Sequence, residues 1–183
     1  MTAQQDRERL LAILRKDAFF REKITLSSGK TSDFYIDARR VTLSAQGSYL
    51  CASLILDLLK NEKVDAIGGP TLGADPLLGA IGVLSFQAGK PINTFIIRKA
   101  PKPYGKQQQI EGPLLKPSDR IILIDDVATT GNSIVQSIDI LEQLGLKAEK
   151  AICIVDRCEG AREALAQKNC KLISLFKSSE ITN

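Results

Sequence analysis

The sequence contains 183 residues, of which 44% are hydrophobic and 25% are charged, and its formal net charge is +4. This length suffices for one soluble domain with a sizeable core, here residues 1–183, and is short for two domains. The charge is too small to indicate a nucleic-acid partner, and no apolar run approaches the length of a membrane span.

The cysteine and histidine content narrows the possible chemistry. No C-x-x-C pair occurs among the four cysteines, so neither a zinc site nor a disulfide framework is indicated. The absence of histidine excludes Ser–His and Cys–His nucleophilic catalysis and histidine metal ligands. The polar N-terminus leads into no signal-peptide core, so we expect a cytoplasmic protein. Its chemistry must use carboxylates, lysine, arginine, tyrosine, backbone amides and a bound ion.

Helix-like and strand-like stretches alternate along the chain. Apolar residues at helical spacing predict a first helix over residues 6–16. A short segment, 23–38, contains the strand-like run Phe34-Tyr35-Ile36, and a second helix is predicted over 48–61. The rest of the chain is predicted to form five buried strands, at 64–68, 92–97, 120–124, 150–155 and 171–176, with helices at 76–88, 133–144 and 160–168 between them.

This alternation predicts an α/β fold with a mainly parallel sheet that is flanked by helices on both faces. The strands are almost continuous apolar runs, as a sheet buried on both faces requires. Ligands of such sheets bind beyond the carboxyl ends of the strands. Functional residues are therefore expected in the loops after residues 68, 97, 124 and 155.

The third of these loops joins two adjacent carboxylates to a turn rich in hydroxyl groups. Residues 121–133 read IILIDDVATTGNS, so Asp125 and Asp126 follow four apolar residues. The turn offers backbone N–H groups, hydroxyl groups and the positive end of a helix dipole, which together suit a phosphate monoester. The carboxylates are suited to accept hydrogen bonds from sugar hydroxyls or to hold a hydrated Mg²⁺. The segment thus fits both ends of a ribose 5-phosphate, whereas an ordinary helix cap at Asn132 or Ser133 explains only one residue.

This segment resembles the site for phosphoribosyl pyrophosphate (PRPP) in type I phosphoribosyltransferases, which has apolar residues, two acids, a variable pair and then Thr-Thr-Gly. The resemblance implies the fold of that family, with a small N-terminal hood at about residues 20–40, and Mg²⁺ as the cofactor. It implies that Asp125 and Asp126 contact ribose hydroxyls, and the metal through water. The PRPP-binding residues implied in this segment are Asp125, Asp126, Val127, Ala128, Thr129, Thr130, Gly131, Asn132 and Ser133.

Two other nucleotide-binding motifs are excluded by their spacing. A Walker A motif needs a glycine, four residues and then Gly-Lys-Ser/Thr. The run Gly29-Lys30-Thr31 matches its end, but Ile24 occupies the position of its first glycine. Gly68 and Gly73 have the required separation, but Ala74-Asp75 follow them. No Gly-x-Gly-x-x-Gly opens a helix either, so kinase-like and dinucleotide-binding functions are not supported.

A basic loop follows the second of the five strands. Residues 98–106 read RKAPKPYGK, with four cations and no acid. Taken alone, the loop fits a solvated surface as well as it fits a ligand, but beside a phosphate-binding loop it is suited to neutralise a pyrophosphate. It is similar to the catalytic loop of orotate phosphoribosyltransferases, which in that family reaches the active site of a partner subunit and so implies a homodimer. The residues that this similarity implies for PRPP binding are Arg98, Lys99, Lys102 and Tyr104, with Lys99 and Lys102 catalytic.

The loop after the first strand is rich in glycine and precedes a helix. Asp75 is predicted to be the N-cap of this helix and Pro76 its first residue. Glycine lets the backbone approach a ligand closely, although a plain strand–helix turn has the same composition. The family resemblance assigns Thr71, Leu72 and Gly73 to pyrophosphate binding.

The loop after the fourth strand contains Arg157. An arginine can hold a carboxylate with two parallel N–H groups, and orotate differs from uracil by a carboxylate. The Val-Asp-Arg motif of the family places Arg157 on the pyrimidine, and Thr129 is expected to orient the same base. The alternative is a surface arginine paired with Glu159 or Asp156.

Near the N-terminus, residues 26–37 look like the hood segment that covers the base in this family. Ser27 stands where many members have lysine. Phe34 or Tyr35 either stacks on the pyrimidine or belongs to the core.

The resemblance implies an orotate phosphoribosyltransferase, a pentosyltransferase that makes orotidine 5′-monophosphate and pyrophosphate from orotate and PRPP. Its catalytic residues would be Lys99, Lys102, Asp125 and Asp126. Two alternatives stay open: a phosphoribosyltransferase for another base, such as a purine, and a nucleotide-sensing regulatory protein on the same fold. Neither a nucleic acid nor a membrane is expected as a partner.

Overall fold

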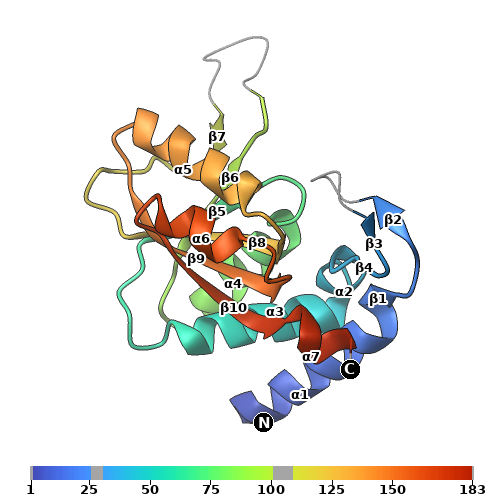
Figure 1. Ribbon diagram of the computed structural model, residues 1–183. Coiled ribbons are helices and arrows are strands. Elements are labelled where there is room, and N and C mark those ends of the chain that lie inside the picture. Colours follow the sequence, from blue (N-terminus) through green and yellow to red (C-terminus); the bar gives the residue numbers. More distant parts are fainter. Residues whose placement is uncertain (1, 26–30, 101–108, 183) are drawn as a thin grey trace.

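A central sheet organises the protein, which is described here by a computed structural model over residues 2–25, 31–100 and 109–182. The strands of this sheet are β5 (Ala66–Pro70), β6 (Asn93–Ile97), β7 (Ile110–Glu111), β8 (Ile121–Ala128), β9 (Ala148–Asp156) and β10 (Lys171–Lys177). Within the described ranges the sheet has six strands, in the order β10-β9-β8-β5-β6-β7 (Figure 1). Adjacent strands are parallel except for the edge pair of β6 and β7, which is antiparallel.

Helices connect most of these strands, and side chains cap the first of them. The helices are α1 (Ala3–Ile13), α2 (Arg39–Thr42), α3 (Ala45–Leu58), α4 (Asp75–Gln87), α5 (Asn132–Gln143), α6 (Ala161–Ala166) and α7 (Ser178–Thr182), and a π-helical turn, η1 (Leu14–Ala18), extends α1. The Thr2 hydroxyl accepts a hydrogen bond from the Gln5 N–H at 3.3 Å, and the Gln5 side chain accepts one from the Thr2 N–H at 2.9 Å. This reciprocal pair satisfies N–H groups that have no partner inside the helix.

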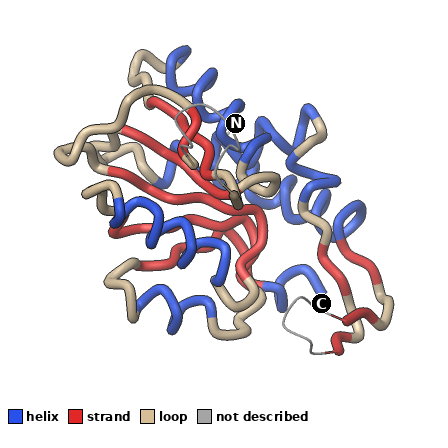
Figure 2. The backbone as a smooth tube through the Cα atoms, turned by 90° about the horizontal axis from the view of Figure 1, so that it is seen from above, coloured by secondary structure: helices blue, strands red, loops and turns tan. Residues whose placement is uncertain are grey.

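The sheet carries a hydrophobic core on each face because successive side chains of a strand point to opposite faces. From β8, Ile122 and Ile124 pack into one cluster with buried side chains of α1, α3 and α4. Ile121 and Leu123 pack into the other cluster, with buried side chains of α5 and α6. Figure 2 shows helices on both sides of the strands. Burial of each such side chain contributes about 1.5–3 kcal/mol to the free energy of unfolding. The two clusters therefore stabilise the sheet and, with it, the positions of the strand ends.

The strand order reverses direction between β5 and β8. From β5 the chain continues to β6 on one side, whereas β8, β9 and β10 are added on the other. Pairing between β5 and β8 ends at Gly68 and Leu123, but pairing between β8 and β9 continues to Ala128 and Asp156. The carboxyl end of β8 therefore runs past its neighbour at a topological switch point, which is where ligands of such sheets bind.

Two short antiparallel strand pairs lie in the N-terminal segment. They are β1 (Phe19–Phe20) with β4 (Tyr35–Ile36), and β2 (Ile24–Thr25) with β3 (Thr31–Ser32). The Phe34 ring lies under the guanidinium of Arg157, 4.7 Å from the ring centroid to Cζ. This contact joins the N-terminal pairs to the end of β9, in the region expected to form a hood.

The sequence prediction of an α/β fold with a mainly parallel sheet is confirmed, and three details are wrong. The strand expected at 64–68 is β5, two residues later, and the strand expected to end at residue 124 continues to Ala128 because β9 still pairs with it. Asp75 is the first helical residue rather than the N-cap, which is Ala74 and makes no side-chain cap bond. The strand-like run Phe34-Tyr35-Ile36 corresponds to β4, whereas the other short elements, β1 to β3, β7, α2 and α7, were not expected.

No helix in the described part of the chain has both the length and the apolar character needed to cross a bilayer.

The close approach of β5 to β6 gives a test of the core. A Cβ added to Gly68 would lie 2.2 Å from the Phe95 ring, and the side chain of Phe95 is fully buried. We predict that Gly68→Ala destabilises the protein by about 1–3 kcal/mol, the cost typical of overpacking. In thermal unfolding this corresponds to a fall in Tm of about 2–4 °C for each kcal/mol. The matched control is Gly82→Ala, where the nearest atom, Thr94 Oγ1, lies at an ordinary 3.6 Å; an equal Tm for both variants would contradict the packing argument.

Candidate active site

Two carboxylates lie side by side near the end of β8. Asp125 is 6% exposed; its Oδ1 accepts a hydrogen bond from the Asp126 N–H at 2.9 Å, and its Oδ2 accepts one from the Ser133 hydroxyl at 2.8 Å. Asp126 Oδ1 accepts a hydrogen bond from the Val127 N–H at 2.8 Å. Ser133 lies in the first turn of α5, so its bond to Asp125 closes the turn that joins strand to helix.

Burial and mutual repulsion change the protonation of this pair. Burial, followed by the negative charge of Asp126, raises the pKa of Asp125 to about 8, against the opposing hydrogen bond from Ser133. Burial also raises the pKa of Asp126, and this rise is opposed by hydrogen bonds from Val127 and by the positive charge of Arg39. The pair therefore holds a proton more readily than ordinary aspartates do. A ligand that brings a cation or hydroxyl donors stabilises the ionised carboxylates.

Asp125 and Asp126 are called the diacid below, and the turn between them and α5 is shaped to receive an anion. Val127 and Ala128 are still in β8, and Thr129 and Thr130 are half-buried in the turn. Gly131 is the N-cap of α5 and has φ of 81°, a left-handed conformation that favours glycine. A Cβ at this position would also lie 2.8 Å from Leu165 Cδ1. Asn132 and Ser133 follow as the first residues of α5, where N–H groups and the helix dipole favour negative charge.

The loop after β5 reaches the diacid directly. A Cβ added to Gly73 would lie 2.5 Å from Asp125 Oδ1 and 2.5 Å from Asp126 Oδ1, so only glycine permits this approach. The Thr71–Leu72 peptide bond is cis. Thr71 is half-buried, whereas Leu72 is 68% exposed and directs its side chain to solvent. The structure therefore brings the loop 71–73 and the diacid together, as the sequence reasoning expected.

Arg157 lies at the end of β9 and is buried. Its side chain is 3% exposed, and its Nε donates to Glu159 Oε1 at 2.7 Å. The Arg157 N–H donates to the Ala128 carbonyl at 2.9 Å, which ties this residue to the turn after the diacid. The alternative prediction of a surface arginine is wrong, because the Arg157 side chain is buried. The ion pair with Glu159 that this alternative included is present. Phe34, half-buried against the core, contacts Arg157, as described above.

Arg39 was missed by sequence reasoning. Its Nε donates to Asp37 Oδ1 at 3.0 Å, and its charge interacts favourably with Asp126. Asp37, Arg39, Leu72 and Asp75 contribute to the lining of a cavity of about 580 Å³ beside the loop 71–73. The Asp-Ala-Arg-Arg run at 37–40, directly after the strand-like Tyr35-Ile36, was the available signal.

The first residues of the basic loop share a cavity with Ser133, the residue that donates to Asp125. Arg98 and Lys99 follow β6 and line a cavity of about 300 Å³ together with Ser133. Arg98 Nη1 lies 3.5 Å from Glu111 Oε1, and its buried Nε has no hydrogen-bond partner among the described residues. Lys102 and Tyr104, and also Ser27 in the hood, lie outside the described residues.

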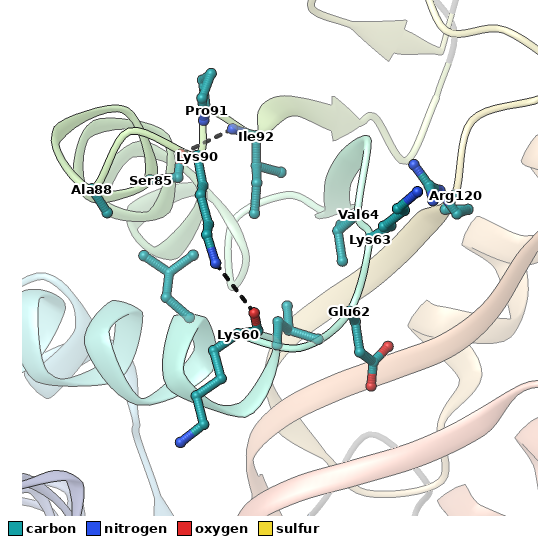
Figure 3. A pocket seen from close by; sticks show the side chains of 12 residues that line it. Lys60, Glu62, Lys63, Val64, Ser85, Ala88, Lys90, Pro91, Ile92 and Arg120 are labelled. Carbon is teal, nitrogen blue, oxygen red and sulfur yellow. Dashed lines mark hydrogen bonds between the residues drawn. The ribbon is translucent and has the colours of Figure 1, made fainter.

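A separate hollow of about 490 Å³ lies at the amino ends of β5, β6 and β8, away from the two carboxylates (Figure 3). Lys60, Lys63, Lys90 and Arg120 line it, and the side chains of three of them have partners. Lys60 pairs with Asp57 at 3.1 Å and Arg120 with Asp65 at 2.6 Å, and Lys90 Nζ donates to the Lys60 carbonyl just beyond α3 at 3.4 Å. These charges serve ion pairs and the negative end of a helix, so this hollow is not the candidate site.

The donor set at the carboxyl edge fits a hydrated divalent cation. The residues that the structure describes contain no group of three or more His, Cys, Asp or Glu side chains placed to hold a metal. Asp125 and Asp126 nevertheless offer adjacent carboxylate oxygens, the ligand type that Mg²⁺ prefers, and Mg²⁺ normally retains water and ligand oxygens. A metal held mainly by substrate and water, with these carboxylates beside it, is compatible with the site.

Comparison with known proteins gives a consistent result over nearly the full chain. No protein-family model matches the sequence. The orotate phosphoribosyltransferase of Aquifex aeolicus is 38% identical over 179 residues, covering 96% of this chain and 97% of that protein. The orotate phosphoribosyltransferase of Thermosynechococcus vestitus is 42% identical over 175 residues, covering 96% and 92%. The crystal structure of Mycobacterium tuberculosis orotate phosphoribosyltransferase in complex with PRPP superimposes with a TM-score of 0.80 at 30% identity, covering 97% of this chain and 99% of that one.

The raised pKa of Asp125 makes stability depend on pH. Its folded value of about 8 lies above the value of about 3.9 for an unfolded aspartate, so the protonated form is favoured by folding. The resulting stabilisation is complete below about pH 4 and is lost as the pH rises to about 8. We predict that Asp125→Asn, which cannot ionise, raises Tm relative to wild type increasingly between pH 5 and about 8.5. Differential scanning calorimetry tests this, with the exposed Asp17→Asn as the control; parallel Tm curves for Asp125→Asn and wild type would contradict the burial argument.

Proposed function

Because the chain belongs to the orotate phosphoribosyltransferase family, we propose that the diacid, the turn after it, the loop 71–73, the basic loop and Arg157 form its active site. The enzyme is a pentosyltransferase that transfers the ribose 5-phosphate of PRPP to orotate, giving orotidine 5′-monophosphate and pyrophosphate in pyrimidine biosynthesis. One observation supports the site assignment most directly. Gly73 lies against both carboxylates, and the Ser133 hydroxyl donates a hydrogen bond to Asp125.

In this proposal each segment binds one part of the substrates. Residues 128–133 hold the 5-phosphate at the amino end of α5. Asp125 and Asp126 accept hydrogen bonds from the ribose hydroxyls. The loop Thr71-Leu72-Gly73 binds the pyrophosphate through its backbone. Thr129 and Arg157 orient the pyrimidine.

The chemistry needs no protein nucleophile. We expect a transition state with oxocarbenium character at the anomeric carbon, which orotate approaches as pyrophosphate departs. Rate acceleration then comes from positioning and from stabilisation of the developing charge. Arg98, Lys99, Lys102 and Tyr104 contact the pyrophosphate, with Lys99 and Lys102 neutralising it as it leaves.

Mg²⁺ is the proposed cofactor. Bound beside Asp125 and Asp126, mainly through water and substrate oxygens, it would neutralise pyrophosphate charge and help to fix the ribose. The closeness of the two carboxylates supports this assignment, since their mutual repulsion falls when a cation is near. We also propose that the protein acts in the cytoplasm and works as one domain over residues 1–183.

A homodimer is proposed because an apolar stripe extends from the site along α4. Leu43 (71% exposed) and Leu72 (68%) line the same cavity as Pro76, and Val83 (59%) and Phe86 (75%) continue the stripe along α4. Positions three and seven apart share a helix face, so Pro76, Val83 and Phe86 lie on one face of α4. A second copy seated there would lie next to the loop 71–73.

Substitution of the stripe tests the dimer. We predict that Phe86→Glu converts the protein from a dimer to a monomer in sedimentation-velocity experiments and strongly lowers turnover, because a buried unpaired charge opposes association. The matched control is Leu114→Glu, at a 90% exposed apolar position away from α4, which should remain dimeric. A wild type that is monomeric at all concentrations would end this part of the proposal.

The base preference tests the reaction itself. With PRPP and Mg²⁺ supplied, we expect pyrophosphate release with orotate and little with uracil or hypoxanthine, because only orotate offers a carboxylate to Arg157. Release with hypoxanthine in place of orotate would indicate a purine enzyme on the same fold. No turnover with any base, together with specific nucleotide binding, would indicate a regulatory protein instead.

A further inference from the structure

The Arg157 side chain is held on two sides by neighbouring groups. Its Nε donates to Glu159 Oε1 at 2.7 Å, and its Cζ lies 4.7 Å from the centroid of the Phe34 ring. The arginine side chain is 3% exposed, whereas that of Glu159 is 28% exposed. Glu159 therefore lies at the rim of the site and reaches inward to a buried cation.

The backbone around Arg157 is fixed independently of Glu159. The Arg157 N–H donates to the Ala128 carbonyl at 2.9 Å, and the Arg157 carbonyl accepts from the Ser178 hydroxyl at 3.3 Å. Buried Asp156 accepts from the Cys158 N–H at 2.8 Å and from Arg162 Nε at 2.7 Å. These bonds hold the chain in place, so what Glu159 adds is control over the direction of the Arg157 side chain.

Two features of a guanidinium make the orientation of the Arg157 side chain important for binding a carboxylate. It is a planar fork, so its recognition of a carboxylate depends on the orientation of the plane. It also remains charged at all ordinary pH values, so a buried guanidinium without a counter-charge is costly. Glu159 supplies a counter-charge and accepts from the Nε edge, while the Phe34 ring lies against the guanidinium.

We propose that Glu159 is a positioning residue for orotate: it holds the Arg157 guanidinium against Phe34 in the orientation in which the fork meets the substrate carboxylate. This inference rests on the proposed function, since it assigns Arg157 to the pyrimidine. Glu159 itself touches neither substrate, so its removal acts on orotate through Arg157 and leaves the PRPP-binding segments in place.

Steady-state kinetics of three variants test the proposal. Glu159→Ala removes the acceptor, and we expect the KM for orotate to rise about tenfold or more while the KM for PRPP stays within about twofold of wild type, since a hydrogen bond to a charged group is lost. Glu159→Gln keeps an oxygen acceptor and should recover most of the loss. Glu163→Ala removes an exposed carboxylate on α6 near the same turn and is the control for a change of charge.

The outcomes separate this inference from the proposed function. Wild-type protein that does not turn over orotate would overturn the proposed function and this inference with it. Active wild type with an unchanged orotate KM in Glu159→Ala would overturn only the positioning role. An equal rise in both KM values, or a rise that Glu159→Gln does not reverse, would indicate a structural role and also count against it. Should Glu159→Ala fail to fold, as judged by its Tm, the orotate and PRPP KM values of Glu159→Gln, which must stay near wild type, become the test.

Discussion

The pairing of buried Asp125 with half-buried Asp126 near the end of β8 is the constraint on which the rest of the site depends. Placing Asp125 and Asp126 together in a poorly hydrated position is unfavourable for both charged forms, and the raised pKa of Asp125 reflects this. The structure offsets part of the cost with N–H and hydroxyl donors, among them Ser133. A ligand that brings hydroxyl groups and a cation offsets more, so the site is destabilised when empty and favoured when filled.

Segments that are distant in the sequence meet at this point because the sheet is parallel. The carboxyl ends of β5, β6, β8 and β9 lie along one edge, so the loops after them face a common crevice. The hydrogen bond between the Arg157 N–H and the Ala128 carbonyl joins the candidate base site to the turn after the diacid. Gly73 joins the loop after β5 to both carboxylates through contact that a larger residue would block. The geometry of the strand ends thus supports a site that binds a sugar phosphate, its leaving group and an acceptor base together.

Much of this arrangement follows from the sequence, and the failures have physical causes. The apolar strands and the acidic run at 125–126 carry strong local patterns, so the sequence predicted the parallel sheet and two acids near the carboxyl end of one of its strands. The end of β8 was misjudged because two acids look like a strand end, whereas the pairing of β9 with β8 keeps them in the sheet. Arg39 was overlooked because its closeness to Asp126 arises only when the N-terminal segment folds over the strand ends. The burial of Arg157 and its contact with Phe34 likewise depend on tertiary packing, which a local pattern does not encode.

The central claim is that the diacid binds the ribose of PRPP. Isothermal titration of the protein with PRPP in the presence of Mg²⁺, repeated on Asp126→Asn, measures this most directly. Binding of about one PRPP per chain to wild type, weakened about tenfold or more in a folded Asp126→Asn variant, is the result expected from the loss of charge-assisted hydrogen bonds. Equal PRPP affinity in the two proteins would contradict the claim.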